Sequence, residues 1–382
     1  MDDEQLDVVA AGHICVDITP AFSNVSGSDV SEILRPGKLL EVGSPTISTG
    51  GPVSNTGLAL RRLGLSVSLM GKCGDDPFGE MLIDVLGREA PGAEQGMSVV
   101  AGENTSYTIV VAPPGIDRIF LHCPGANNTF GPEDVDLELV AQARLFHFGY
   151  PPLMRSMYVS GGRALGEVMK QARNAGAVTS LDLALPDPDS EAGKADWRTI
   201  LSTGLPHTDI FLPSLEELMF MLDRDRFDEL TSGSESIANS FEPEDIRTLA
   251  GECVQLGAPI VVIKCGHVGA YLKTSESLEV PAGFLVDQDR WSGVEVFEPT
   301  CRVEEIASTT GSGDSSIAGF LATILRGGSP DRCMKALTVV GAQNLSALDA
   351  VSGVKSWEET ERELEDEPEK NPLPDRLLSL RG

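Results

Sequence analysis

The stretch Ser308-Thr309-Thr310-Gly311-Ser312-Gly313-Asp314 guides the interpretation of the whole chain. Small residues lead directly into an aspartate, and an apolar helical pattern follows over residues 317–325. A glycine-rich turn that opens a helix presents unpaired backbone N–H groups, and the helix dipole adds partial positive charge there. We therefore predict an anion pocket suited to phosphate. Asp314 lies at its rim, where a carboxylate can accept a proton from an attacking hydroxyl.

A Gly-x-Gly-Asp pattern is also typical of an ordinary tight turn, and two other phosphate-binding motifs have different sequence requirements. A dinucleotide fingerprint needs a third glycine at position 316, where the chain has Ser316. A Walker-type loop needs Gly-Lys followed by Ser or Thr, and the chain has no such tripeptide. Neither motif explains the stretch.

Composition narrows the class of protein. The chain has 382 residues, 41% of them hydrophobic, and a formal net charge of −29. This charge predicts no binding to nucleic acid or to anionic membranes. There is no run of 18 apolar residues, and the acidic N-terminus lacks the basic start of a signal peptide. The seven cysteines include no Cys-x-x-Cys pair, which predicts reduced thiols in a cytoplasmic protein and neither a disulfide framework nor a zinc site.

Apolar segments of two kinds alternate along the chain. Short runs predict strands near residues 7–12, 38–43, 67–70, 145–148, 178–183, 210–212, 260–263 and 270–272. Helical periodicity is found near residues 53–63, 78–89, 163–174, 197–201, 215–222, 246–256 and 333–348. This alternation predicts an α/β fold, with an open, mostly parallel sheet covered on both faces.

Two stretches interrupt this alternation. Segments of about 16–48 and 98–124 have hairpin patterns and predict a small separate β-sheet. Residues 223–245 are acidic and serine-rich, which predicts a surface excursion. Residues 356–382 are rich in Glu, Asp and Pro and predict a solvated tail in which residues 377, 378 and 380 can dock.

Four separate motifs together resemble the ribokinase-like (PfkB-type) carbohydrate kinase family. Gly50-Gly51-Pro52-Val53-Ser54-Asn55 and Thr310-Gly311-Ser312-Gly313-Asp314 resemble its two signatures. Residues 71–79 and 263–270 resemble the turn after the first signature and the turn beside the nucleotide. The resemblance covers about residues 6–355. It implies a kinase domain over 1–355, with a three-layer αβα core, a β-sheet lid from the segments 16–48 and 98–124, and an acidic tail over 356–382.

The resemblance also implies a reaction, the transfer of the ATP γ-phosphoryl group to a hydroxyl of a small sugar or sugar derivative. Asp314 would be the general base, and the amides of Gly311, Ser312 and Gly313 would hold the migrating phosphoryl. Phosphoryl transfer needs mainly alignment and charge stabilisation, which these residue types supply.

On the sugar side, four residues are implied in substrate binding. Asp17, after the first strand, would accept hydrogen bonds from substrate hydroxyls, although an aspartate there can also be a turn residue. Gly50 and Gly51 would let the substrate approach the backbone where a Cβ would clash. Asn55 can donate and accept hydrogen bonds at once, as sugar recognition requires.

On the nucleotide side, Ser214 and Glu217 occupy the place of the family's Asn-x-x-Glu motif, with Ser214 in place of the asparagine. Glu217 would orient waters around Mg²⁺, although a glutamate in a first helical turn also favours the helix dipole by itself. Lys264, Gly266 and Gly269 would line the ATP cleft.

Departures from the family pattern leave several points open. Dependence on a monovalent cation is open because Ser308 stands where the family often has an aspartate. Cys15 replaces the asparagine of ribokinases proper, and no ribose-contacting glutamate is found near residues 148–151, which argues against ribose. The predicted lid residues that set specificity are Tyr107, Phe120, His122 and Asn127.

Two alternatives to a sugar kinase stay open. A nucleoside kinase of the same fold would need an aromatic slot for the base, and only 5% of the chain is aromatic. A non-catalytic sugar-binding or regulatory protein would be compatible with the substitutions at Ser214 and Ser308, whereas the intact Asp314 argues against it. The expected partner is a small sugar-type molecule, and a homodimer through the lid is a further expectation.

Overall fold

The computed structural model describes residues 6–22, 33–113, 118–232, 236–278, 280–281, 284 and 287–380. Its main sheet has eight strands in the order β14-β13-β12-β11-β10-β9-β1-β4. In that order the strands are Glu295–Pro299, Gly269–Thr274, Ile260–Lys264, Ile210–Phe211, Val178–Asp182, Ala143–Gly149, Leu6–Gly12 and Val67–Met70. Pairing is parallel from β4 to β12, and β13 and β14 add an antiparallel edge. The mostly parallel sheet predicted from the sequence is confirmed.

Strand β1 shows why this sheet is buried on both faces. Val8 and Ala10 belong to one core cluster, whereas Val9 and Ala11 belong to the other. Successive side chains of a strand point to opposite faces, so a sheet covered on both faces needs apolar residues at consecutive positions. This requirement explains the continuous apolar run in the sequence.

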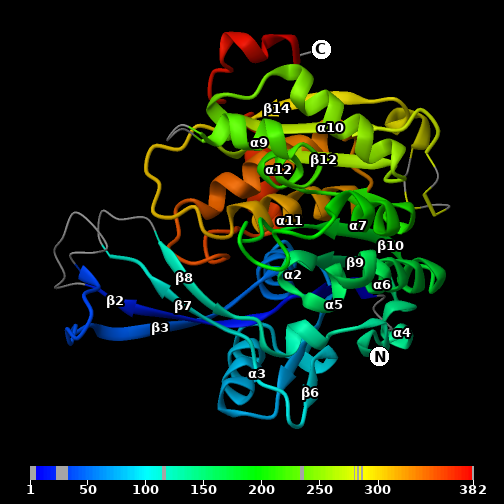
Figure 1. The fold of residues 1–382 in the computed structure, drawn as a ribbon. Helices are drawn as coiled ribbons and strands as arrows, with labels where there is room; N and C mark the ends of the chain where they lie inside the picture. The colour runs from blue at the N-terminus through cyan, green and yellow to red at the C-terminus, as the bar shows by residue number, and fades with distance from the viewer. Residues whose placement is uncertain are drawn as a thin grey trace.

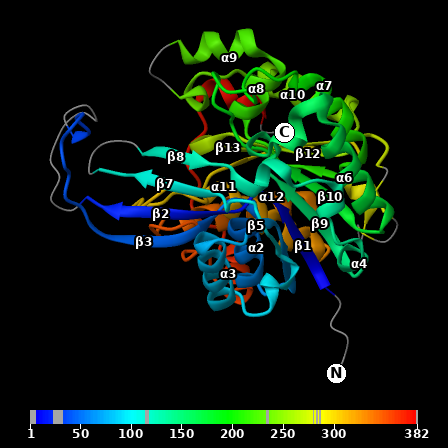
Figure 2. The same ribbon diagram turned by 60° about the horizontal axis from the view of Figure 1, so that its bottom comes forward.

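Helices cover both faces of the sheet (Figure 2). One face packs against α2 (Pro52–Arg62), α3 (Pro77–Glu89), α11 (Ser312–Leu325) and α12 (Pro330–Asn344). The other packs against α4 (Leu137–Val140), α5 (Arg155–Tyr158), α6 (Arg163–Asn174), α7 (Trp197–Gly204), α8 (Leu215–Leu222) and α10 (Pro243–Gln255). The result is a three-layer αβα core.

A second, four-stranded sheet projects from the core (Figure 1). Its order is β3 (Gly43–Gly50), β2 (Cys15–Ala21), β7 (Tyr107–Val111) and β8 (Ile119–Cys123). This sheet, called the lid below, confirms the separate sheet expected from the hairpin patterns. Residues 23–32 and 114–117, which belong to the two predicted lid segments, lie outside the described residues.

The lid differs from the sequence prediction at two places. The strand predicted over 38–43 begins only at Gly43, and residues 38–42 form no strand. Ser98–Val100 forms β6, which pairs with β5 (Lys72–Gly74) in a two-stranded sheet and not with the lid. The second lid segment therefore starts at Tyr107.

The C-terminal segment is ordered and packs on the core, whereas the sequence predicted a mostly solvated tail. Helix α13 (Trp357–Glu365) and a 3-10 turn, Asp375–Leu380, bury Leu364, Leu377 and Leu380. The acidic excursion likewise contains helix α9 (Arg224–Thr231), which buries Phe227. Sparse apolar residues are enough to dock such segments because the core already offers a surface to cover them.

The part of the chain that the structure describes contains neither a membrane-spanning helix nor a disulfide bond. No helix in it combines the length and the apolar character needed to cross a membrane. All seven cysteines lie in it, and none forms a disulfide.

Candidate active site

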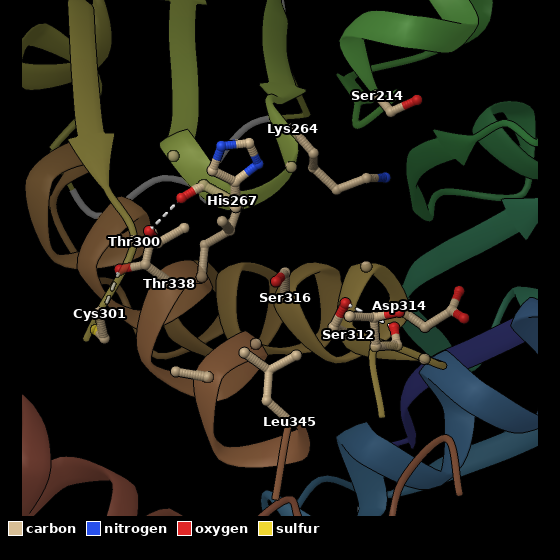
Figure 3. Close-up of a pocket in the computed structure, with 18 of the residues that line it drawn as sticks. Ser214, Lys264, His267, Thr300, Cys301, Ser312, Asp314, Ser316, Thr338 and Leu345 are labelled. Atoms are coloured by element: carbon tan, nitrogen blue, oxygen red, sulfur yellow. Dashed lines mark hydrogen bonds between the residues drawn. The ribbon is translucent and has the colours of Figure 1, made fainter. Parts of the chain in front are cut away.

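A cavity of about 630 Å³ opens between the start of α11, helix α12 and the turn that joins β12 to β13. Figure 3 shows Lys264 and Asp314 at one end of it and Thr300 and Cys301 at the other. Nine of the predicted site residues line this cavity: Ser214, Glu217, Lys264, Gly266, Gly269, Gly311, Ser312, Gly313 and Asp314. Residues from three distant parts of the sequence therefore meet in one place.

The start of α11 presents backbone N–H groups to the cavity. Gly311 is the N-cap residue and has φ of 71°, a left-handed conformation that favours glycine. A Cβ at this position would lie 2.3 Å from the carbonyl oxygen of Ala350. A Cβ on Gly313 would have only Lys264 Cε near it, at 3.9 Å, so the space beside Gly313 is open. An anion can approach the helix start there.

One of the three amides predicted to hold the anion is used elsewhere. The Ser312 N–H donates to the carbonyl of Thr309 at 3.3 Å, within the turn before the helix. The amides of Gly313 and Asp314 have no acceptor among the described residues. Of the three predicted amides, those of Gly311 and Gly313 therefore have no acceptor among the described residues, whereas the turn itself uses that of Ser312.

The Asp314 carboxylate is buried and surrounded by donors. Asn55 Nδ2 donates to Oδ2 at 3.0 Å, and the Thr56 hydroxyl donates to Oδ1 at 3.3 Å. The Tyr150 hydroxyl lies 2.9 and 3.0 Å from the two carboxylate oxygens. Burial raises the pKa of Asp314, while the hydrogen bonds from Asn55 and Tyr150 act in the opposite direction. A carboxylate in this setting can serve as a proton acceptor with a tuned basicity.

Tyr150 was not predicted as a site residue. It follows β9 directly and has φ of 62°, which is uncommon for a bulky side chain. Residues with such strained backbone conformations cluster at active sites and ligand-binding sites, where the surrounding structure holds them in place. The sequence offered only a weak signal, since the residue follows the carboxyl end of a buried parallel strand, where ligands bind in open α/β sheets.

Lys264 forms a buried ion pair that the sequence also did not reveal. Its Nζ lies 2.8 Å from Asp182 Oδ1, and it also donates to the carbonyl of Leu212. The side chain of Lys264 is 14% exposed and that of Asp182 only 3%. Burial raises the pKa of Asp182, and the positive charge of Lys264 acts against this shift. Asp182 ends strand β10, as Tyr150 follows β9, so the same weak signal applied to both.

Ser214 and Glu217 form a capping box at the start of α8. The Ser214 N–H donates to Glu217 Oε2 at 2.7 Å, and the Glu217 N–H donates to Ser214 Oγ at 3.2 Å. This arrangement satisfies two of the backbone donors at the helix start. Glu217 Oε1 makes no hydrogen bond within the described residues, and Glu217 lines the cavity. The pair therefore has a structural role whether or not it also contacts a ligand.

Gly269 closes the turn after β12 under a steric requirement. Its φ is 149°, and a Cβ there would lie 2.4 Å from the carbonyl oxygen of Glu298. Gly266 also has a positive φ, of 57°, and a Cβ would meet only Ala238, at 3.5 Å. The two predicted glycines thus shape the turn between β12 and β13, which forms part of the cavity wall.

The four residues predicted on the sugar side lie where the lid meets the core. Gly51 is the N-cap of α2, with φ of 90°, and Asn55 is in the first turn of the same helix. A Cβ on Gly50 would lie 2.3 Å from Asp17 Oδ2. Burial raises the pKa of Asp17. Asn55 connects this group to Asp314, so Asp314 lies between the cavity and the sugar-side residues.

Of the four lid residues predicted to set specificity, His122 contacts His13, which follows strand β1. Its Nε2 is 3.4 Å from His13 Nε2. Asn127 is buried and bonds to the backbone N–H and carbonyl of Ile14, which gives it a structural role. Tyr107 packs against Phe78 with ring centroids 5.1 Å apart, and Phe120 is 56% exposed. The sequence could not rank these residues because their surroundings are contacts with residues far away in the chain.

His13 lies beside this group and was not predicted. It is 2% exposed, and a Cβ on Gly51 would lie 2.6 Å from its Nδ1. Burial lowers the pKa of His13, and partial burial lowers that of His122, which keeps an exposed surface. Both imidazoles are therefore neutral near pH 7 and can donate as well as accept hydrogen bonds.

Comparison with known proteins agrees with this geometry. The model of the pfkB family carbohydrate kinases matches residues 6–356. Probable fructokinase-4 of Arabidopsis thaliana is 28% identical over 231 residues, which are 59% of this chain and 64% of that protein. Fructokinase-2 of Solanum lycopersicum is 26% identical over 324 residues, which are 83% of this chain and 81% of that protein. The match thus spans less than two thirds of the first of these relatives.

Two solved structures share the fold. Ribokinase of Arabidopsis thaliana, complexed with ribose and ATP, has a TM-score of 0.70 at 19% identity, covering 94% of this chain and 98% of that chain. Fructokinase with bound ATP from Xylella fastidiosa has a TM-score of 0.68 at 19% identity, covering 95% and 99%. Together with the family match over nearly the whole length, the fold and the site lead to one conclusion: the chain belongs to the pfkB family of carbohydrate kinases.

Proposed function

We propose that this protein is a kinase that transfers the γ-phosphoryl group of ATP to a hydroxyl of a small sugar or sugar derivative. The observation that carries the proposal is the place of Asp314. Its carboxylate borders the cavity at the free amides of α11 and is bonded at 3.0 Å to Asn55, which belongs to the sugar-side group. A base at this position lies between the proposed sites of the nucleotide and the sugar.

In the proposed step, the sugar oxygen forms a bond to the γ-phosphorus while the bond from that phosphorus to the β-phosphate oxygen breaks and ADP leaves. Asp314 accepts the hydroxyl proton as the new bond forms. The amides of Gly313 and Asp314, at the positive end of the helix dipole, offset charge on the phosphoryl oxygens. The ammonium group of Lys264, at the same end of the cavity, adds to this effect.

The cavity fits a nucleoside triphosphate in its chemistry. The helix start and Lys264 supply anion-binding groups at one end, and Leu337, Ala342 and Leu345 supply apolar wall farther along α12. Mg²⁺, when bound, neutralises phosphate charge. Glu217 would hold it through water, because its Oε1 is not used in the capping box. The fructokinase names of the relatives support fructose as the first sugar to test.

We also propose an oligomeric state and a cellular compartment. A homodimer through the lid is supported by exposed apolar residues on lid strands, namely Ile47, Phe120 and Leu121. The cytoplasm is the proposed compartment.

The test is a coupled assay of ADP release with MgATP and a panel of fructose, other hexoses, ribose and nucleosides. Asp314→Asn should lower kcat by about 10²- to 10⁴-fold on the accepted sugar, because it removes the general base. Sugar and nucleotide binding, measured by calorimetry, should persist. Asp331→Asn is the matched control, since Asp331 is an exposed aspartate in the first turn of α12.

Three outcomes would contradict the proposal. Turnover of nucleosides alone would favour the nucleoside kinase. Binding of a sugar without turnover in the natural protein would favour a non-catalytic binding protein. Full activity in Asp314→Asn would rule out the proposed base.

A further inference from the structure

Four side chains that can bind a metal ion come together where the core meets the lid. His13 follows core strand β1, Cys15 and Asp17 lie on β2, and His122 lies on β8. One ligand atom from each of His13, Cys15 and His122 lies within 4.8 Å of the other two. Asp17 Oδ1 is 3.3 Å from the Cys15 sulfur. The sequence predicted no zinc site, because its residues are not arranged in a metal-binding motif.

The spacing of these atoms is close to that of a tetrahedral site. Zinc binds imidazole nitrogen at about 2.0–2.1 Å and thiolate sulfur at about 2.3 Å, so ligand nitrogens of one tetrahedron are about 3.3 Å apart. The Nε2 atoms of His13 and His122 are 3.4 Å apart. Two facing imidazole nitrogens share at most one proton, so at least one lone pair already points at the space between them.

The surroundings of His122 also suit a ligand. Its Nδ1 lies 3.1 Å from the hydroxyl of Thr108, a buried residue of lid strand β7. A hydrogen bond on the far nitrogen fixes the tautomer and orientation of a metal-binding histidine and leaves Nε2 for the metal. Thr108 Oγ1 also lies 3.5 Å from the Cys15 sulfur, so one hydroxyl supports two of the three ligands.

We propose that His13, Cys15 and His122 bind a zinc ion, with the fourth position open to water and with Asp17 beside the thiolate. Imidazole and thiolate are the ligands that zinc prefers. On binding, the Cys15 thiol loses its proton to solvent and the sulfur–zinc bond forms, with no change of oxidation state. Because His13 belongs to the core and His122 to the lid, the ion would join the two parts.

Cobalt(II) is the probe, because it takes the place of zinc and reports its ligands by absorption. The full-length protein without a polyhistidine tag, treated with chelator, should bind one Co²⁺. It should show a thiolate-to-cobalt charge-transfer band and the strong visible bands of a tetrahedral site, and zinc should displace both. Cys15→Ser should remove the charge-transfer band, and His122→Asn should weaken binding at least about tenfold.

Matched controls separate the site from general effects. Cys123→Ser changes the residue next to His122 on the same strand, and His207→Gln changes a histidine outside the cluster. Both should bind Co²⁺ like the natural protein. His122→Asn changes a residue with an exposed surface, so it keeps the test valid if Cys15→Ser does not fold. Absence of the charge-transfer band, or its retention in folded Cys15→Ser, would overturn the proposal.

One consequence rests on the proposed function. Because Asp17 borders the metal ligands, zinc at low micromolar concentration should raise the apparent KM for sugar and leave that for ATP unchanged, and chelation should reverse the effect. An unchanged sugar KM with a fully loaded site would overturn this consequence alone. A protein that turns over no sugar would contradict the proposed function, while the cobalt spectrum would still decide the metal site.

Discussion

We call the proposed nucleotide-binding cavity the nucleotide end and the proposed sugar-binding residues the sugar end, and the two are built in different ways. The nucleotide end rests on the start of one helix, the turn after β12 and a buried ion pair, Lys264 with Asp182. The sugar end is assembled from the core and from three strands of the lid. The first is fixed by the same packing that holds the sheet together. The second depends on how the lid is placed, so changes at the two ends should have different consequences.

The largest effect should come from breaking the ion pair at the nucleotide end. Lys264→Met leaves Asp182 buried without its partner and should lower the free energy of unfolding by about 3–5 kcal/mol. Adding Asp182→Asn should recover much of this loss, because the buried charge is then gone. Urea denaturation of both variants is the measurement, with Lys170→Met, whose side chain is 51% exposed, as the control.

The same variant carries a pH dependence. Burial raises the pKa of Asp182 above its unfolded value, so protonation of this carboxyl favours the folded state. The stabilisation that the protonated Asp182 carboxyl gives to the folded state is present at low pH and is lost as the pH rises through the pKa of the folded protein. The defect of Lys264→Met should therefore shrink toward acidic pH. A defect that grows on acidification would contradict this account.

A smaller effect is expected from Gly311→Ala, which tests whether the start of α11 needs glycine for more than its positive φ. Gly311→Ala and Gly92→Ala both place a side chain at positive φ, which costs about 1–3 kcal/mol. The added Cβ meets Ala350 in the first case and nothing within 4 Å in the second. Gly311→Ala should thus be the less stable variant by thermal or urea unfolding, and it alone should bind MgATP more weakly. Equal behaviour of the two variants would mean that the helix start plays no special part.

At the sugar end, Asp17→Asn should change catalysis without changing stability much. Loss of a charge-assisted hydrogen bond of about 1.5–3 kcal/mol predicts a drop in kcat/KM for sugar of about 10- to 100-fold, with the KM for ATP unchanged. Steady-state kinetics with each substrate varied gives the comparison, and Asp84→Asn on the surface of α3 is the control. A parallel rise in the KM for ATP would show that the two ends are not separable.

The smallest effect concerns Tyr150, which lies between the two ends. Its hydroxyl donates to Asp314 and favours the ionised carboxylate, so Tyr150→Phe should raise the pKa of that base. The base must be ionised to act, so the acid limb of the kcat/KM profile should move to higher pH. Tyr158→Phe, in α5, should leave the profile unchanged. A shift of the acid limb to lower pH would contradict this account of Tyr150.

Much of the core could be predicted because its signals are local. Strand Val67–Met70 and helices Arg163–Asn174 and Leu215–Leu222 have the predicted bounds, since period and burial agree over each segment. Strand Glu295–Pro299 was missed because it lies at the edge of the sheet and its two adjacent apolar residues are flanked by glutamates. The docking of helix Trp357–Glu365 was missed because few of its residues are apolar.

The same distinction between local and distant signals applies to the residues of the candidate site. Gly311, Gly313 and Asp314 could be found from one contiguous motif, and Gly50, Gly51 and Asn55 from another. Asp182, Tyr150 and His13 could not, because each follows or ends a strand with no motif around it. Their roles come from partners far away in the chain, and no local pattern records such a partner.

By itself the sequence determined the alternation of strands and helices, the glycine-rich helix start and the carboxylate beside it. These follow from side-chain period and from backbone conformations that are set within a few residues. Only the tertiary structure decided that Tyr150 and Asn55 meet on Asp314 and that Lys264 pairs with Asp182. It also brought His13, Cys15 and His122 together. Contacts of this kind depend on how the sheet and the lid bring distant strands side by side.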